Sequence, residues 1–559
     1  MAKADLHVHS KHSNRPTEWI LRQAQAPESF TEPKEIYRLC RERGMDFVTV
    51  SDHDSVAGAL EIAHLPGVFL SSEVTVAFPE DGTHVHCLVS GVTEAQHREI
   101  QRLSGNVYEL RDYLVAEAIV HSVAHPLVRV NGRLSLAQFE KLLVLFNRFE
   151  GLNGIHDRRA NELLRRIVDR LDRGVIEDLA ARHRLRPHGP RPWVKSLTGG
   201  SDDHGGFYIA TTWTETPPAA TVEAYLAHLK ADAHVPGGAT GSTLRLTQSL
   251  YGIAYEFYRR RFLPLLSDRS DPFARLLQLL ATPPTVTAEP PARRRLFFLS
   301  APGRRRKRPA APAAGAGTTP DQETFGFASQ ASRRALQGLL EDFAREIRRG
   351  RLSRCLGAAA NLAPFALTLS PFLVALHAQH RDRDLVDGAA ERFLGFRGAG
   401  GVADRAAWFT DDPAADLPWA ETALAASGLA EMAALTCGEG QPPGIPVRRF
   451  APLAELPLPV RARLSFAVPP VLEVLEHCER ERYAQIFVST PGPMGLLAVA
   501  AGKILGLKIT SLLPADLPAR VLRETGSEAL ADGCREYLRW LSGQMDEVGA
   551  VEMPLESVA

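Results

Sequence analysis

The chain has 559 residues, of which 45% are hydrophobic, and 65 Lys and Arg side chains balance 65 Asp and Glu side chains. At about 150 residues per domain, this length predicts roughly three or four domains. A net charge of zero provides no overall field that would attract nucleic acid or an anionic membrane, so neither is expected as a partner. Scattered cysteines without a CxxC pair, and an N-terminus without an apolar run, predict a cytoplasmic protein.

The first region, residues 1–235, alternates short apolar runs with helix-like stretches. The runs include DFVTVS at 46–51, VFLSSEV at 68–74, HVHCLVSGV at 84–92 and IVHSVAHP at 119–126. This alternation predicts an α/β domain with a largely parallel sheet or barrel. In such architectures the loops at the carboxyl ends of the strands carry the chemistry.

Polar residues at the ends of these runs form a candidate metal site. Side chains alternate along a strand, so the HVH pair places His7 and His9 on one face. Imidazole with carboxylate favours Zn, Mn or Fe, and a site with many ligands can hold two or three ions that activate water and bind phosphate. The candidates are His7, His9, Asp52, His53, Glu73, His86, His125, Glu150, Asp202 and His204. A purely structural role, the alternative for any histidine, is assigned to His12, His64, His97, His121, His156, His183 and His188.

The segments DLHVHS, TVSDHDS, SSEVT, HVHCL, VAHP and GGSDDHG, in this order, resemble the PHP (polymerase and histidinol phosphatase) domain family. The resemblance implies a distorted (β/α)7 barrel and metal-dependent hydrolysis of a small phosphorylated substrate. It also implies two or three divalent ions per chain, which could be Mn, Zn, Fe or Mg. By this resemblance the first ion and the catalytic set belong to His7, His9, Glu73 and Asp202. Glu73 would bridge to a second ion held by His86 and His125, and His53 with His204 would serve a third.

Three further residues bear on this site. Asn14 stands where many family members carry Asp, and a neutral amide is a weaker ligand, so the number of ions, two or three, stays open. Arg129, just after VAHP, and Lys195, shortly before GGSDDHG, are candidate phosphate-binding residues. The alternative for both is an ordinary surface cation.

The middle of the chain is predicted to be helical and to contain a linker. Residues 236–281 read as a helical extension of the first domain, and the Pro-, Arg- and Ala-rich stretch 282–330 reads as a flexible linker. Within it, the basic run from Arg304 to Arg308 could touch nucleic acid or acidic lipid, although such runs are more often merely solvated. Residues 331–455 read as a helical region without recognisable chemistry.

The stretch 355–378 has no charged residue over a length that could span a bilayer. Its apolar content is largely Ala and Gly, and it contains Pro364 and Pro371. We therefore expect a buried helical pair that is broken at the prolines, in preference to a membrane span.

Residues 456–559 contain a βαβ unit in which a strand, the turn PGPMG, a helix and a second strand follow one another. The segment VSTPGPMGLLAVAAGKILGLKITSLLPADLP resembles the N-terminal Rossmann half of family-4-like retaining glycosyltransferases. Gly492 and Gly495 in the turn would bind an anionic group at a helix N-terminus, and the expected partner is a sugar or glycosyl acceptor. A plain packing turn is the alternative. Pro514 stands where these enzymes carry His, and the resemblance covers only one of the two Rossmann halves of such enzymes.

Three hypotheses follow. The leading one is a cytoplasmic bacterial metal-dependent phosphoesterase whose C-terminal glycosyltransferase-like half is a structural or binding module. The second is a glycosyltransferase, or the remnant of one, with the PHP domain as accessory. The third is a PHP domain that serves as a metal-stabilised scaffold without turnover.

Overall fold

The computed structural model describes residues 1–13, 27–261, 362–395, 405–457 and 465–548. These residues form two compact units, which are described separately. The first unit contains the described residues up to 261 together with 382–395, and the second contains the rest.

Several sequence expectations fall outside the described residues. They are Asn14, the end of the helical extension beyond residue 261, the linker 282–330 with the basic run Arg304 to Arg308, and the first part of the apolar stretch, 355–361.

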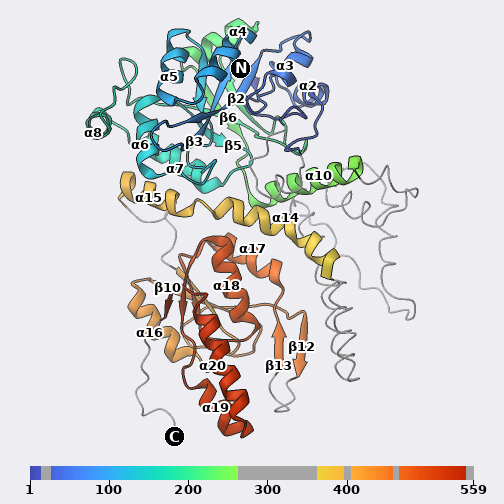
Figure 1. Cartoon of the computed structure of the whole chain (residues 1–559), viewed down its shortest axis with the longest axis vertical. Coiled ribbons are helices and arrows are strands. Elements are labelled where there is room, and N and C mark those ends of the chain that lie inside the picture. The colour runs from blue at the N-terminus through green and yellow to red at the C-terminus, as the bar shows by residue number, and fades with distance from the viewer. Residues whose placement is uncertain (14–26, 262–361, 396–404, 458–464, 549–559) are drawn as a thin grey trace. The chain divides into compact units, whose positions relative to one another are not determined.

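The first unit is a mixed α/β structure with two sheets, of strand orders β1-β7-β8 and β2-β3-β4-β5-β6 (Figure 1). Its strands are β1 (Ala2–Ala4), β2 (Ser71–Ala77), β3 (His84–Ser90), β4 (Val120–Val123), β5 (Arg148–Asn153), β6 (Ser196–Gly200), β7 (Thr212–Thr216) and β8 (Val235–Gly238). Its helices are α2 (Pro33–Glu42), α3 (Ala57–Ile62), α4 (Glu94–Leu103), α5 (Val107–Ala116), α6 (Leu136–Leu145), α7 (Arg158–Val168), α8 (Arg173–His183), α9 (Val222–Lys230), α10 (Thr243–Arg261) and α15 (Arg383–Leu394). Strands β4, β5 and β6 are parallel, whereas β2, β3 and β4 pair antiparallel.

The regular ladders of the first unit do not close into a barrel, so the expected (β/α)7 barrel is found only as a mixed α/β fold. Irregular backbone hydrogen bonds link the segment after β1 to segments on both sides. His9 N donates to Asp203 O (3.1 Å), and Ser51 N donates to Val8 O (2.9 Å). Glu73 N in turn donates to Ser51 O (3.1 Å). These bonds bring the ends of strands that are far apart in sequence to one place.

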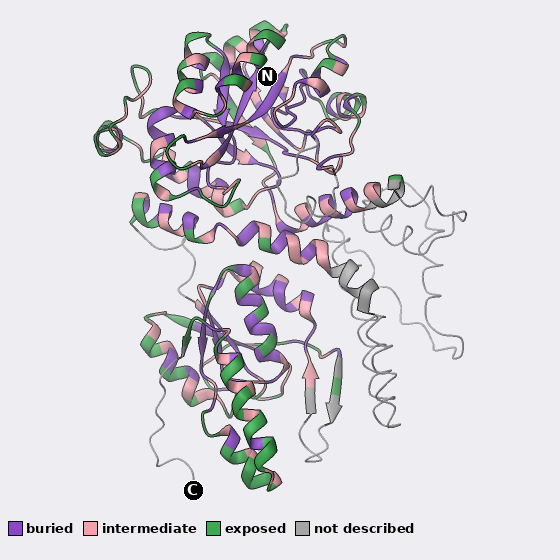
Figure 2. Ribbon diagram, in the orientation of Figure 1, coloured by how far each residue is buried: buried purple, intermediate pink, exposed green. Residues whose placement is uncertain are grey.

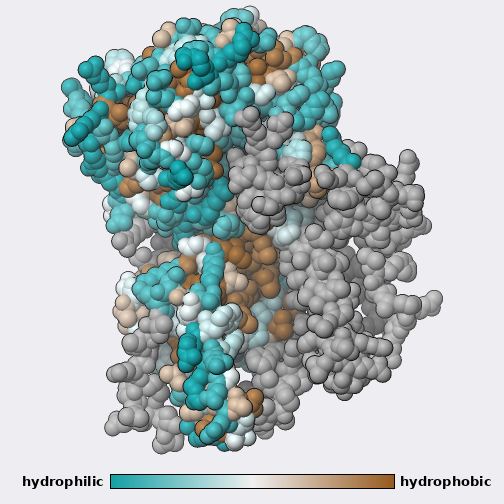
Figure 3. Space-filling model, in the orientation of Figure 1, coloured by the Kyte–Doolittle hydropathy of each residue, from teal (hydrophilic) through white to brown (hydrophobic). Residues whose placement is uncertain are grey.

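Apolar side chains fill the interior of the first unit, and most residues of its strands are buried, with β8 as the exception (Figure 2). Its visible surface is mostly hydrophilic (Figure 3). Val8 lies in an apolar core cluster with Ile36 and Val50. Its neighbours His7 and His9 are also fully buried but are not part of this apolar cluster. The alternation along one strand therefore separates the apolar packing from the polar site.

Helix α15 belongs to the first unit although it lies more than 100 residues beyond α10 in sequence. Leu385 and Ala389 are part of the main apolar cluster, and α15 packs against α6 and α7. Arg392 Nε lies 2.8 Å from the buried Glu140 Oε1 on α6, which adds a charged contact to the apolar one. This docking was not expected from the sequence, which placed 331–455 in a separate helical region.

The second unit contains a six-stranded parallel sheet of order β11-β10-β9-β14-β15-β16 and a separate β12-β13 pair. Its strands are β9 (Arg405–Phe409), β10 (Glu431–Thr436), β11 (Val447–Arg449), β12 (Ala454–Pro457), β13 (Ser465–Val468), β14 (Gln485–Val488), β15 (Lys508–Ser511) and β16 (Glu547–Val548). Its helices are α14 (Leu362–His380), α16 (Leu417–Ser427), α17 (Val471–Glu481), α18 (Pro493–Leu505), α19 (Leu517–Thr525) and α20 (Glu528–Ser542).

Two expectations are corrected by this sheet. The prediction that 331–455 is helical is wrong from residue 405 onward, because β9, β10 and β11 are strands of the sheet. The βαβ unit predicted within 456–559 is present as β14, α18 and β15, but it is one half of a larger doubly wound sheet. The chain order reverses between β9 and β14, and this reversal is the topological switch point of the sheet.

Helix α14 is continuous, so the expected pair of helices broken at prolines is wrong over the described part of that stretch. Pro364 lies in the first turn, where a missing N–H costs no helical hydrogen bond, and Pro371 lies inside the helix. Within the described ranges, no helix combines the length and the apolar character that crossing a bilayer requires.

Candidate metal centre

The structure gathers all eight predicted metal ligands of the first unit in one place, here called the histidine–carboxylate cluster. Its members are His7, His9, His53, Glu73, His86, His125, Asp202 and His204. His125 and Asp202 follow the carboxyl ends of β4 and β6, and Glu73 and His86 lie on β2 and β3. Seven of the eight are buried, and His204 is partly exposed.

Glu73 lies at the centre of the cluster and is completely buried. Its Oε2 is 3.1 Å from His7 Nε2, 3.2 Å from His9 Nε2 and 3.1 Å from His53 Nδ1. Its Oε1 is 2.8 Å from His86 Nδ1 and 3.0 Å from His125 Nε2. The two oxygens thus face two different groups of imidazoles, which is the arrangement a carboxylate needs to bridge two cations.

Asp202 provides the second buried carboxylate. Its Oδ1 lies 3.3 Å from both His7 Nε2 and His9 Nε2. The backbone makes this approach possible at Gly200, where a Cβ would overlap the side chain of His7. Asp202 and His125 have positive φ values of 52° and 25°, a strained conformation for residues other than glycine. The fold therefore holds two of the predicted ligands in costly backbone conformations.

The donor set of the cluster fits a divalent cation. Several buried ring nitrogens lack a hydrogen-bond partner of acceptable geometry among the described residues: His7 Nε2, His9 Nε2, His53 Nδ1, His86 Nε2 and His125 Nδ1. The first three of these nitrogens lie 3.1–3.2 Å from the same oxygen of Glu73. Two ligand atoms bound about 2.1 Å from one cation lie about 3.0–3.4 Å apart, depending on the bond angle. These spacings match ligands that share an ion.

The charges of the cluster point the same way. Burial opposes ionisation of Glu73 and Asp202, but the neighbouring imidazoles, His7 foremost, hold the pKa of both carboxyls well below the usual range. Burial would lower the pKa of His53, yet its carboxylate neighbours raise it to about 10. Burial dominates at His125 and lowers its pKa to about 4. Without metal, the carboxylates are ionised and imidazoles with a raised pKa hold protons. A divalent cation that binds the site would displace these protons.

A second layer of polar groups orients these ligands. His7 Nδ1 lies 2.8 Å from Glu150 Oε1, and the other oxygen of Glu150 accepts from His125 N (3.0 Å). His9 Nδ1 is 3.2 Å from Ser13 Oγ. Such partners fix the tautomer and ring orientation of a ligating histidine. Glu150, one of the sequence candidates, therefore lies behind the ligands.

Asp52, another sequence candidate, also lies outside the ligand groups. Its carboxylate accepts from Ser10 N (2.6 Å) and from Ser10 Oγ (2.7 Å), so it shapes the loop after the HVH strand.

Three residues at the cluster were missed by the sequence reasoning. Glu28 Oε2 lies 3.2 Å from His53 Nε2, and no motif or strand end marks this residue. Asn153, the last residue of β5, donates to Asp202 Oδ2 (3.0 Å), and the strand-end rule could have found it. His156 was assigned a structural role, but its Nε2 lies 3.3 Å from Asp202 Oδ2.

Two other histidines that were assigned structural roles pair elsewhere in the first unit. His12 Nε2 lies 3.1 Å from Glu61 Oε2, and His183 Nε2 lies 2.7 Å from Glu140 Oε2. Neither belongs to the ligand groups of the cluster.

Arg129 and Lys195, the candidate phosphate-binding residues, have structural partners. Both guanidinium Nη atoms of Arg129 bind the carboxylate of Asp384 on α15, with a shorter distance of 2.5 Å. Lys195 Nζ donates to Phe146 O (2.7 Å), and burial lowers the pKa of Lys195 to about 7. Lys195 precedes β6 and therefore lies at the end of that strand away from Asp202. The geometry assigns neither residue to the cluster.

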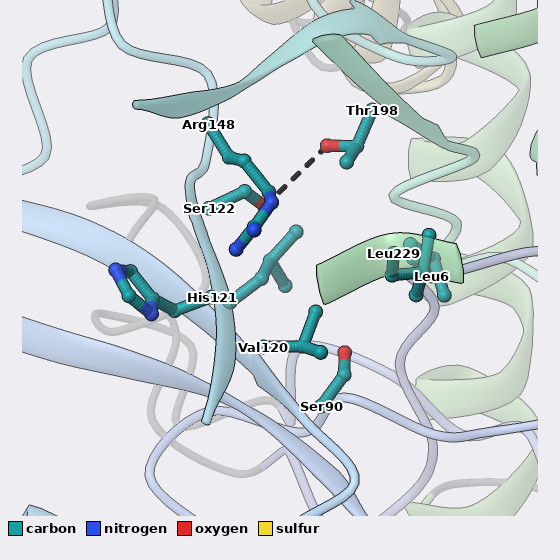
Figure 4. Close-up of a pocket in the computed structure, with 9 residues that line it drawn as sticks. Leu6, Ser90, Val120, His121, Ser122, Arg148, Thr198 and Leu229 are labelled. Carbon is teal, nitrogen blue, oxygen red and sulfur yellow. Dashed lines mark hydrogen bonds between the residues drawn. The ribbon is translucent and has the colours of Figure 1, made fainter. Parts of the chain in front are cut away.

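A small cavity lies at the opposite end of the same strands (Figure 4). Among the residues that line it, His121 and Arg148 lie at the amino ends of β4 and β5, and Thr198 lies on β6. His125 and Asp202, in contrast, follow the carboxyl ends of β4 and β6. Burial lowers the pKa of His121 to about 4. The cavity is therefore separate from the histidine–carboxylate cluster.

Gly492 and Gly495 of the second unit face the protein interior. A Cβ at Gly492 would overlap the carboxylate of Asp411, and a Cβ at Gly495 would overlap the backbone oxygen of Thr490. Asp411 accepts a hydrogen bond from the backbone N–H of Met494 in the first turn of α18, and burial raises the pKa of its carboxyl. A side chain of the protein thus already interacts with the helix N-terminus at which an anionic ligand was expected.

No family model matches the chain, but a curated protein and solved structures are similar to parts of it. An uncharacterized protein of Methanocaldococcus jannaschii is 34% identical over 67 residues, which are 12% of this chain and 37% of that protein. The match therefore spans little more than a third of that relative. A solved structure described as "a putative metal-dependent phosphoesterase" from Bifidobacterium adolescentis is similar over 36% of this chain and 88% of that chain, at 18% identity and a TM-score of 0.22.

Proposed function

We propose that the first unit is a metal-dependent phosphoesterase that hydrolyses a small phosphorylated substrate. The observation that carries this proposal is the position of Glu73, whose two oxygens face two groups of imidazoles at 2.8–3.2 Å. Divalent ions held there would lower the pKa of water and neutralise charge on a phosphate group. Mn, Zn, Fe and Mg are the candidate ions, at two or three per chain.

In this proposal the protein's own residues have distinct roles. His7, His9, Asp202 and Glu73 would hold the first ion, and His86 and His125 would hold the second together with Glu73. Glu150 keeps the ring of His7 in place through their 2.8 Å contact, so that the Nε2 lone pair faces the site. The burial of the ligands excludes bulk water, which strengthens each electrostatic contact.

The finer fold and domain assignments belong to the same proposal. The backbone bonds between the segments ending at His9, Ser51 and Glu73 are the irregular links that a distorted (β/α)7 barrel would contain. We propose a PHP-type domain over 1–235, which is completed by α15. A linker at 282–330 and a doubly wound sheet that begins near 405 are the other proposed parts.

The test uses the full chain. Purified protein is loaded with Mn, Zn or Mg and assayed against phosphomonoester and phosphodiester panels, together with H9A and D202A. Loss of a ligand is expected to lower phosphate release by more than about 100-fold. The control is H12A, because His12 pairs with Glu61 outside the ligand groups.

Two results would contradict the proposal. One is a wild-type chain that binds none of the tested ions, and the other is phosphate release that H9A and D202A leave unchanged. Bound metal without turnover on any ester of the panel would favour the scaffold hypothesis.

Glycosyl transfer remains a second candidate function, for the second unit. One observation favours it: doubly wound sheets bind ligands at the topological switch point, which lies here between β9 and β14. The contact of Asp411 with the start of α18 speaks against an anionic ligand at that helix. Binding of a nucleotide sugar or a sugar acceptor to the full chain in calorimetry would support this candidate.

A further inference from the structure

Glu28 places a third carboxylate at the histidine–carboxylate cluster. It is buried, with 5% of its surface exposed. Its Oε2 lies 3.2 Å from His53 Nε2, and its Oε1 lies 3.8 Å from His204 Nε2. The ligand atoms of His9, His53 and His204 lie within 4.8 Å of one another, so Glu28 borders a group of three imidazoles.

The loop that carries Glu28 is fixed to the strand of the first ligands. Lys11 N donates to Thr31 O (2.8 Å), and Ser29 Oγ donates to His9 O (3.2 Å). Because both bonds join the loop to the segment immediately after the HVH pair, the fold defines where the Glu28 carboxylate lies. These bonds hold the Glu28 carboxylate beside the imidazoles before any ligand binds.

The hydrogen bonds of His204 leave its second nitrogen directed at a carboxylate. Its Nδ1 lies 3.0 Å from the backbone oxygen of Asp202, which can only accept, so Nδ1 carries the proton. In a neutral ring Nε2 then has a lone pair, and it has no hydrogen-bond partner among the described residues. This lone pair and the Glu28 oxygen, 3.8 Å away, are both acceptors and cannot bond to each other. A cation between them could be bound by both atoms.

Charge leads to the same conclusion. Imidazoles are neutral ligands, and a buried divalent ion needs anionic partners to offset the loss of its hydration. Glu73 and Asp202 already face the other ligands of the cluster. Glu28 would supply negative charge beside the imidazoles of His53 and His204.

We propose that Glu28, together with His53 and His204, binds a third divalent cation. This inference rests on the proposed function, because it assumes that the rest of the cluster holds metal. It assigns a ligand to a residue that lies in no recognisable motif of the sequence.

The test counts metal on the full chain after loading with MnCl2 and gel filtration, by elemental analysis. Wild type is expected to retain about three ions per chain and E28Q about two, because the amide removes the charge but keeps the size. The matched control is E61Q, since Glu61 is a carboxylate of the same unit that pairs with Lys11 and His12. E61Q is expected to retain the wild-type number.

A second variant covers the case in which E28Q does not fold. E28D keeps the charge but draws it back from His204, and the third ion is expected to bind at least about 10-fold more weakly in a manganese titration. Equal metal counts in wild type and E28Q, or equal affinities in wild type and E28D, would overturn the role of Glu28 and leave the proposed phosphoesterase standing. A wild-type chain that binds no metal would overturn both.

Discussion

Both units gather carboxylates close to their strands, yet the surroundings of these carboxylates differ. In the first unit, Glu73 faces five imidazole nitrogens, several of which have no hydrogen-bond partner among the described residues. At the switch point of the second unit, Asp416 accepts from Thr410 Oγ1 (2.6 Å) and from Ser489 Oγ (2.7 Å). Asp411 likewise accepts from a hydroxyl and a helix amide.

The difference shows what separates a site from a polar layer of the core. Hydroxyls and amides of the protein can satisfy a carboxylate. The carboxylates at the switch point of the second unit therefore have hydrogen-bond partners without a ligand. Facing carboxylates and imidazole lone pairs cannot satisfy one another without a proton or a metal ion. Carboxylates close to strands therefore contribute to a candidate metal centre in one unit and to structural hydrogen bonds in the other.

Removal of metal should affect the two regions unequally and give the largest effect. A ligand that binds only the folded state at 1,000 times its Kd stabilises that state by about 4 kcal/mol. Chelation should therefore speed backbone amide exchange in β2 and β6 and leave β9 and β14 unchanged. Hydrogen exchange followed by mass spectrometry measures both regions in one sample. Equal increases of the exchange rate in the two regions would contradict the proposed difference between the units.

Glu150→Gln should weaken metal binding by about 10- to 100-fold, because it removes the charge that orients His7. A competition assay with a metal indicator measures the affinity. Glu140→Gln is the control, since Glu140 is also buried in the first unit but pairs with Arg182, His183 and Arg392. The control should lower thermal stability while metal affinity stays at the wild-type value. If both variants bind metal equally well, Glu150 has no role in the site.

Asp411→Asn should have the smallest effect and should leave metal content and phosphate release unchanged. Burial raises the pKa of Asp411, so the folded state holds its proton to higher pH than the unfolded state does. Its contribution to stability therefore falls as pH rises above 3.8 through the folded pKa. The variant should lose this dependence and remain within about 1 kcal/mol of wild type at neutral pH. Urea unfolding between pH 4 and 7 tests this, and a large loss of stability would contradict it.

Much of the candidate site could be predicted because its signal is local. The HVH pair, SDHDS, SSEV and VAHP each contain a ligand within a few residues of sequence, and the structure collects these ligands in one cluster. Glu28 could not be predicted in this way, because it lies in a loop without periodicity and reaches His53 only through tertiary hydrogen bonds. His156 was set aside for a similar reason, since proximity to Asp202 depends on the turn after β5.

The sequence by itself determined which residue types stand at the strand ends of the first unit, because side-chain alternation and strand ends are local properties. It also indicated the β14-α18-β15 unit. Only the tertiary structure decided that α15 returns to the core of the first unit, that β9 to β11 extend the sheet of the second, and that Gly492 faces Asp411. These decisions depend on contacts between segments far apart in the chain, which no local pattern of residues specifies.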